Sequence, residues 1–125
     1  PVLRKSKKTT RYGVLYYGST SPSMDEAWTA LEADGVHVDI MRLRAFPFSD
    51  AVVDFINEHE QVFLIEQNRD GQVRTLIVNE LGIDPARVLP VLHYDGTPIT
   101  ARFITKEIAT LTRALDAQQL QGKVA

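Results

Sequence analysis

The sequence contains no cysteine, and it lacks any long apolar run. The absence of cysteine excludes disulfides, cysteine-ligated zinc and iron–sulfur clusters held by this chain. No apolar stretch approaches the roughly 20 residues that cross a bilayer, and the basic, polar start of the chain has no signal-peptide core. We therefore expect no membrane partner, and the lack of thiols suits a cytoplasmic location.

The chain also has little net charge and few histidines. The formal net charge of −2 is too small for a dedicated nucleic-acid binder, so we expect no nucleic acid as a partner. His37, His59 and His93 fall on different expected elements, and no two of them have the spacing of metal ligands. No motif marks a serine or cysteine nucleophile that His93 would serve, so a structural role is favoured for this histidine. No metal site is expected.

The 125 residues suffice for one domain, and 44% of them are hydrophobic, which is typical of a globular protein. We expect residues 1–11 to form a basic linker, residues 12–116 an α/β domain, and residues 117–125 a polar tail that frays. The alternative for the basic stretch RKSKKTTR at 4–11 is an arm that binds phosphate. The linker is favoured because a run of like charges resists packing.

Apolar, strand-like runs alternate with helical periodicity four times along the domain. The runs occupy residues 12–17, 36–43, 61–65 and 88–94. Such alternation predicts a three-layer α/β/α fold, in which a mostly parallel sheet carries helices on both faces. Pro90 removes one hydrogen-bond donor from the last run, which favours an edge position for that strand.

Polar residues follow three of these strands, at the edge where open α/β sheets bind ligands. We expect this edge to be an interface or to border a ligand, without a catalytic residue of its own. The residues concerned are Gly18, Ser19, Thr20, Glu66, Gln67, Asn68, Arg69, Asp70, Gln72, His93 and Asp95.

Two local interpretations stay open at this edge. The stretch GSTSP at 18–22 is either an anion site at a helix N-terminus or a simple cap, in which Ser23 and Glu26 would form a capping box. In EQNRDGQ at 66–72, Asp70 can cap the following helix. Capping explains one polar residue of the seven, so the remainder favour a network that holds the loop for an interface or a ligand.

The chain resembles a known domain in four loops at matching spacings. It is similar to the C-terminal domain of the alpha subunit of 2-oxoacid:ferredoxin oxidoreductases, and the 2-oxoglutarate branch looks closest. The similarity runs from about Tyr12 to about Leu115 and rests on the motifs YYGST, RLRAFPF, EQNRDGQ and HYDGTPIT. The resemblance implies a fold like the C-terminal domain of transketolase, with the four strands in spatial order 2-1-3-4 and one further antiparallel strand. Only residues 1–10 are spare for that strand, and they are poor strand material.

The resemblance also implies a function. Whole enzymes of this family decarboxylate a 2-oxoacid on thiamine diphosphate, pass electrons through iron–sulfur clusters to ferredoxin, and form an acyl-coenzyme A. The chain has no G-D-G motif for thiamine diphosphate, so we expect no cofactor in it. The expected role is a non-catalytic domain, excised from a longer alpha subunit, whose partners are the remaining alpha-subunit domains and the beta subunit. The alternative is a regulatory module that binds a small anion or cofactor at the strand-end loops.

Overall fold

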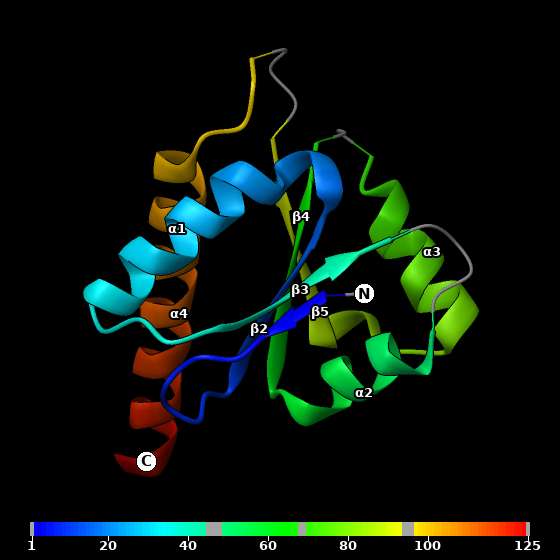
Figure 1. Ribbon diagram of the computed structural model, residues 1–125. Coiled ribbons are helices and arrows are strands. Elements are labelled where there is room, and N and C mark those ends of the chain that lie inside the picture. The colour runs from blue at the N-terminus through cyan, green and yellow to red at the C-terminus, as the bar shows by residue number, and fades with distance from the viewer. Residues whose placement is uncertain (1, 45–48, 68–69, 94–96, 125) are drawn as a thin grey trace.

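The fold is a five-stranded sheet between two layers of helices (Figure 1). We used a computed structural model, which describes residues 2–44, 49–67, 70–93 and 97–124. The strand order is β1-β3-β2-β4-β5; β1 pairs antiparallel with β3, and the other pairs are parallel. The strands are β1 (Val2–Arg4), β2 (Tyr12–Tyr17), β3 (Asp39–Leu43), β4 (Gln61–Glu66) and β5 (Val88–Leu92).

The predicted order of the four parallel strands is confirmed, and so is the edge position of β5 with its proline. One strand boundary differs: β3 begins at Asp39, although the apolar run begins at Val36. The amide of Val36 donates to the carbonyl oxygen of Leu31, at 2.9 Å. The backbone at the start of the run therefore closes the preceding helix instead of joining the sheet.

The further antiparallel strand exists and is formed by Val2–Arg4, inside the segment expected to be a basic linker. It pairs with residues 40–42 of β3. Both Val2 and Leu3 are exposed, at 39% and 45% of their surface. The strand thus rests on backbone pairing with β3 and buries little, which is why the hydrophobic pattern did not reveal it.

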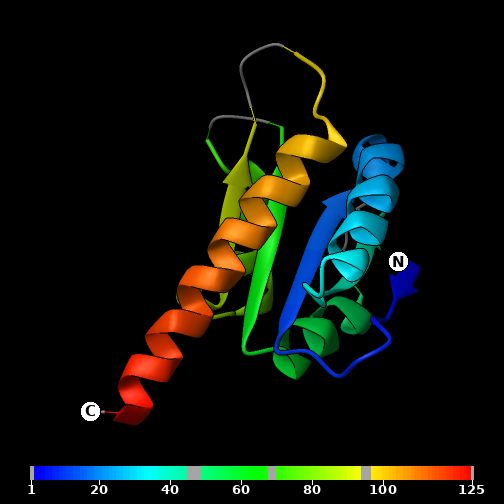
Figure 2. The same cartoon turned by 90° about the vertical axis from the view of Figure 1, so that its left-hand side faces the viewer.

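In the described part of the chain, α-helices cover both faces of the sheet: α1 and α4 lie on one face, and α2 and α3 on the other (Figures 1 and 2). Strand β2 shows why, because successive side chains of a strand point to opposite faces. Val14 and Tyr16 lie in the core under α1 and α4, whereas Leu15 lies in the core under α2 and α3. The helices are α1 (Ser21–Ala33), α2 (Asp50–Glu58), α3 (Gln72–Leu81) and α4 (Ala101–Val124), with short 3-10 turns η1 (Gly18–Thr20) and η2 (Pro85–Arg87).

Helix α4 continues to Val124 and so includes most of the segment expected to fray. Alanine, glutamine, leucine and lysine dominate this segment, and all four favour helix. The division of the chain at residues 11 and 116 stays a prediction. Among the residues that the structure describes, no helix is both long enough and apolar enough to span a membrane.

Candidate functional site

The predicted site residues that the structure describes lie where β2, β4 and β5 end, at the upper side of the sheet in Figure 1; we call this the carboxyl edge. Gly18–Thr20 form η1 directly after β2, Glu66 is the last residue of β4, and His93 follows β5. Asn68, Arg69 and Asp95 lie outside the described residues, and of Ser19 only the backbone is described.

Glu66 is the centre of the described part of this edge. Its side chain is buried, and its two carboxylate oxygens accept hydrogen bonds from the backbone amides of Val73, at 2.7 Å, and Arg74, at 3.2 Å. These amides belong to the first turn of α3, whose partial positive charge favours a carboxylate. Glu66 therefore holds the N-terminus of α3 against the end of β4.

The expectation that Asp70 caps α3 is wrong. The N-cap residue of α3 is Gly71, with a φ of 60°, so no side chain at the cap position bonds to the helix. A left-handed φ favours glycine at this turn. Because glycine has no side chain, the acceptor for the first amides of α3 is the carboxylate of Glu66. The sequence carried a signal for this, since an acidic residue at the end of a buried strand needs partners.

A second hydrogen bond joins two loops of the carboxyl edge. The side-chain amide of Gln67 donates to the hydroxyl oxygen of Thr20, at 2.9 Å, and Thr20 is buried. The proposed capping box is wrong: Thr20 is the N-cap of α1, and Ser23 lies inside the helix, where its hydroxyl donates to the carbonyl oxygen of Ile99. Helix α1 follows η1 directly, so its cap lies at Thr20 and not at Ser23 as the capping box would require.

His93 packs into the fold rather than facing a reacting group. Its half-buried ring meets Phe103 of α4 edge-on, with ring centroids 4.8 Å apart, and its amide donates to the carbonyl oxygen of Glu66, at 2.9 Å. Asp70 and Gln72 are exposed near the start of α3. In the described ranges of the chain, no group of three histidine or acidic residues is placed to hold a metal ion. The described side chains of this edge thus bond mainly to the loops and helices of the fold itself.

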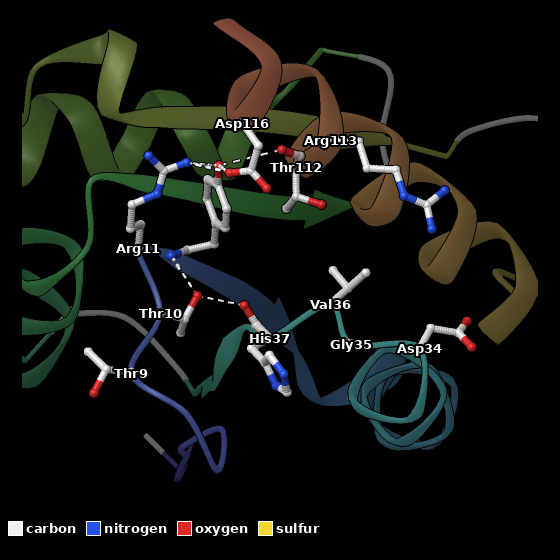
Figure 3. Close-up of a pocket in the computed structure, with 11 residues that line it drawn as sticks. Thr9, Thr10, Arg11, Asp34, Gly35, Val36, His37, Thr112, Arg113 and Asp116 are labelled. Atoms are coloured by element: carbon white, nitrogen blue, oxygen red, sulfur yellow. Dashed lines mark hydrogen bonds and ion pairs between the residues drawn. The ribbon is translucent and has the colours of Figure 1, made fainter. Parts of the chain in front are cut away.

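Pockets lie at the opposite side of the sheet, around residues 5–11, which form the lower loop in Figures 1 and 2, and the start of β2; we call this the amino edge. One pocket of 390 Å³ lies between this loop, the end of α1 and the second half of α4 (Figure 3). On its wall, the guanidinium of Arg11 donates to the hydroxyl of Tyr12 and to the carboxylate of Asp116. Burial raises the pKa of Tyr12 to about 12, and its hydrogen bond to Asp116 adds to the effect. These groups satisfy one another, so they fasten α4 to β2.

A buried histidine–aspartate pair lies beneath the same loop. The Nε2 atom of His59 is 2.8 Å from a carboxylate oxygen of Asp39, and its Nδ1 atom is 2.6 Å from the carbonyl oxygen of Phe55. Both partner atoms are oxygen acceptors, so the ring is held from both of its nitrogen atoms. The other carboxylate oxygen of Asp39 accepts from the amide of Ser6, at 2.7 Å. The sequence placed His59 on an expected element of its own, and nothing in the sequence linked it to Asp39.

Ser6 also joins a second acid–histidine pair. Its hydroxyl donates to the carboxylate of Glu32 and lies 3.1 Å from Nδ1 of His37, which is itself 3.2 Å from Glu32. Burial raises the pKa of Glu32, but the hydrogen bonds from Ser6 and His37 outweigh it, so the pKa is lowered overall. Serine and glutamate meet the same ring nitrogen, so the three residues form no proton relay. They hold the loop in place.

No protein-family model matches the sequence, and no curated protein matches it. Solved structures do. The 2-oxoglutarate:ferredoxin oxidoreductase from Magnetococcus marinus, with 2-oxoglutarate, coenzyme A and succinyl-CoA bound, matches 87% of this chain with a TM-score of 0.76 and 25% sequence identity. This chain spans only 19% of that protein. The alpha chain of a probable 2-oxoacid ferredoxin oxidoreductase from Thermoplasma acidophilum matches 88% of this chain, with a TM-score of 0.56 and 23% identity, and is itself covered over 94% of its length.

Proposed function

We propose, from this structural kinship with 2-oxoacid:ferredoxin oxidoreductases, that the chain is a non-catalytic interface domain of such an enzyme's alpha subunit. The resemblance read from the four loops is confirmed by the solved structures, and the transketolase C-terminal-like fold agrees with them. The proposed complex oxidatively decarboxylates a 2-oxoacid to an acyl-coenzyme A. We propose 2-oxoglutarate as that acid and the cytoplasm as its location.

The observation that carries this proposal is that hydrogen bonds hold the loops of the carboxyl edge in one shape. Its buried carboxylate, Glu66, is occupied by the first turn of α3, and its buried hydroxyl, Thr20, is occupied by Gln67. These polar groups hold the loops in one shape. Such a surface suits the docking of a partner domain, because a preorganised surface loses little conformational freedom on binding. The partners would be the other alpha-subunit domains and the beta subunit, with thiamine diphosphate, an iron–sulfur cluster and coenzyme A held elsewhere in the complex.

The test is made in the assembled complex, by substituting residues of the 66–72 loop. We expect Gln67→Ala and Arg69→Ala to lower the yield of complex recovered through a tag on this chain, or to lower 2-oxoacid-dependent reduction of ferredoxin. Lys106→Ala is the matched control, because Lys106 is an exposed residue of α4, outside the 66–72 loop. Unchanged assembly together with unchanged turnover in both loop variants would remove the proposed role.

The alternative is a regulatory module that catches a small anion or cofactor at the carboxyl edge, with the GSTSP turn at the start of α1. Calorimetry of the full chain with coenzyme A, thiamine diphosphate and 2-oxoglutarate separates the two functions. Saturable binding that disappears in Gln67→Ala, with assembly intact, would favour the module. The interface proposal expects no binding that depends on Gln67.

A further inference from the structure

We propose that the amino edge binds a small molecule that carries both a phosphate group and a planar apolar ring, as a nucleoside phosphate does. The site is formed by Lys7, Lys8 and Trp28. A pocket of 480 Å³ is lined by all three, and a second pocket of 370 Å³ is lined by the two lysines. This site is on the opposite side of the sheet from the carboxyl edge and does not depend on the function proposed above.

The first argument is a surplus of positive charge in the segment that enters the sheet. Within the described ranges, the ammonium groups of Lys7 and Lys8 have no ion pair or hydrogen-bond partner, and both residues are exposed. Lys5 differs, since its ammonium group lies 4.0 Å from Glu58. An anion bound between the two lysines would gain charge-assisted hydrogen bonds without breaking an existing pair.

The second argument is that the acids on the pocket walls are already occupied. Asp39 is paired with His59 and accepts from the amide of Ser6, and Glu32 accepts from Ser6 and lies beside His37. Because of these contacts, neither carboxylate serves as a counter-ion for Lys7 or Lys8. Both carboxylates therefore already have partners, whereas the described residues offer none to the ammonium groups of Lys7 and Lys8.

The third argument is that the loop is held in shape before any ligand arrives. Two separate anchors fix Ser6, one through its amide and one through its hydroxyl. Thr10 adds a third, because its hydroxyl donates to the carbonyl oxygen of His37, at 2.5 Å (Figure 3). Lys7 and Lys8 lie between these anchors in the chain, so their backbone is preorganised and a ligand would pay less entropy to bind.

The fourth argument is the indole of Trp28. Its Nε1 atom donates to the carbonyl oxygen of Val38, at 2.8 Å, which fixes the ring, and the ring is only partly buried. The guanidinium of Arg4 lies 5.9 Å from the ring centroid. A fixed, partly exposed indole can stack on a planar ring, and such stacking is favourable for any planar base. Phosphate on the lysines and a ring on Trp28 together define the ligand class.

Trp28 is the single tryptophan of the chain, so its fluorescence reports directly on this pocket. We would titrate the full chain with ADP, adenosine and inorganic phosphate. The expected result is saturable quenching by ADP, weaker quenching by adenosine, and competition with ADP by inorganic phosphate. Raised salt should weaken ADP binding, because charge carries part of the affinity. The absence of quenching by ADP at millimolar concentration would overturn the proposal.

Matched variants locate the binding. The double variant Lys7→Ala/Lys8→Ala should weaken ADP binding at least about tenfold, whereas Lys7→Arg/Lys8→Arg, which keeps both charges, should stay near the wild-type affinity. Lys106→Ala removes an exposed lysine that lines neither pocket and should change nothing. Both lysines are exposed and unpaired in the described structure, so their loss should not unfold the chain. Equal ADP affinity in the double alanine variant and the wild type would overturn the site.

Discussion

The two ends of the sheet differ in the partners of their buried and partly buried acidic groups. At the carboxyl edge, the carboxylate of Glu66 accepts hydrogen bonds from two backbone amides in the first turn of α3. At the amino edge, Asp39 and Glu32 are occupied by histidines and by Ser6, and the loop they hold leaves two lysines unpaired. At one end the buried acid therefore fixes the start of a helix, and at the other end the acids fix a loop that carries two lysines.

Removing the carboxylate at the carboxyl edge should have the largest effect on stability. In Glu66→Ala, two amides of the first turn of α3 lose a buried, charged acceptor, and we expect unfolding to become easier by about 3 kcal/mol. Urea denaturation followed by far-ultraviolet circular dichroism measures this. Glu80→Ala, an exposed acid on the same helix, is the control and should change stability by less than about 0.5 kcal/mol. Equal effects in the two variants would contradict the assigned role of Glu66.

A single methyl group tests the amino edge. A Cβ atom on Gly13 would lie 2.7 Å from Cε1 of Phe55 and 3.0 Å from Nδ1 of His59. Gly13→Ala should therefore displace the histidine from Asp39 and destabilise the fold by about 2 kcal/mol. The nuclear magnetic resonance signals of His59 should shift with it. Gly18→Ala, at an exposed glycine with open space around it, is the control and should leave both quantities near wild type.

Alkaline pH should weaken the attachment of α4 at the amino edge. The pKa of Tyr12 is raised to about 12 in the folded state, above the ordinary value of 10.0. This contribution to stability is present below pH 10 and is lost as the pH rises towards 12, because the unfolded chain ionises first. Between about pH 9 and about pH 11 the loss should be on the order of 1 kcal/mol.

The variant Tyr12→Phe removes this contribution, so its unfolding free energy should fall less steeply over the same pH range. Other titrating groups are common to both proteins and cancel in the difference. Parallel curves for wild type and variant would show that Tyr12 ionises alike in the folded and unfolded states.

The smallest effect is expected where the carboxyl edge meets water. Gln67 is exposed, and its side-chain amide donates to the buried hydroxyl of Thr20. Gln67→Ala should cost only about 0.5 kcal/mol, because water can replace an exposed donor. The comparison of the two ends then sharpens, since this variant should lower assembly of the complex far more than it lowers stability. A loss of stability comparable to that of Glu66→Ala would make the two effects inseparable.

Sequence periodicity predicted the three layers, because the alternation of strands and helices is visible in long apolar runs. The order of the parallel strands came from the family resemblance. Periodicity missed β1, whose three residues gain backbone pairing but bury little, and the cap of α3 was assigned to Asp70 because capping rules look along the chain. The two acid–histidine pairs were also missed. Asp39 and His59 belong to different elements, and only the packing of α2 against the sheet brings them together.

The position of β2 has a consequence for how the molecule opens. This strand is paired on both sides, by β3 and by β4, and its residues from Tyr12 to Tyr16 are buried. Its amides should therefore exchange with solvent deuterium only when the whole domain unfolds. Strand β1 is held from one side alone and is exposed throughout, so its amides should exchange through local detachment. The chain thus carries a slowly exchanging strand and a rapidly exchanging strand within its first seventeen residues, joined by the loop that bears the two lysines.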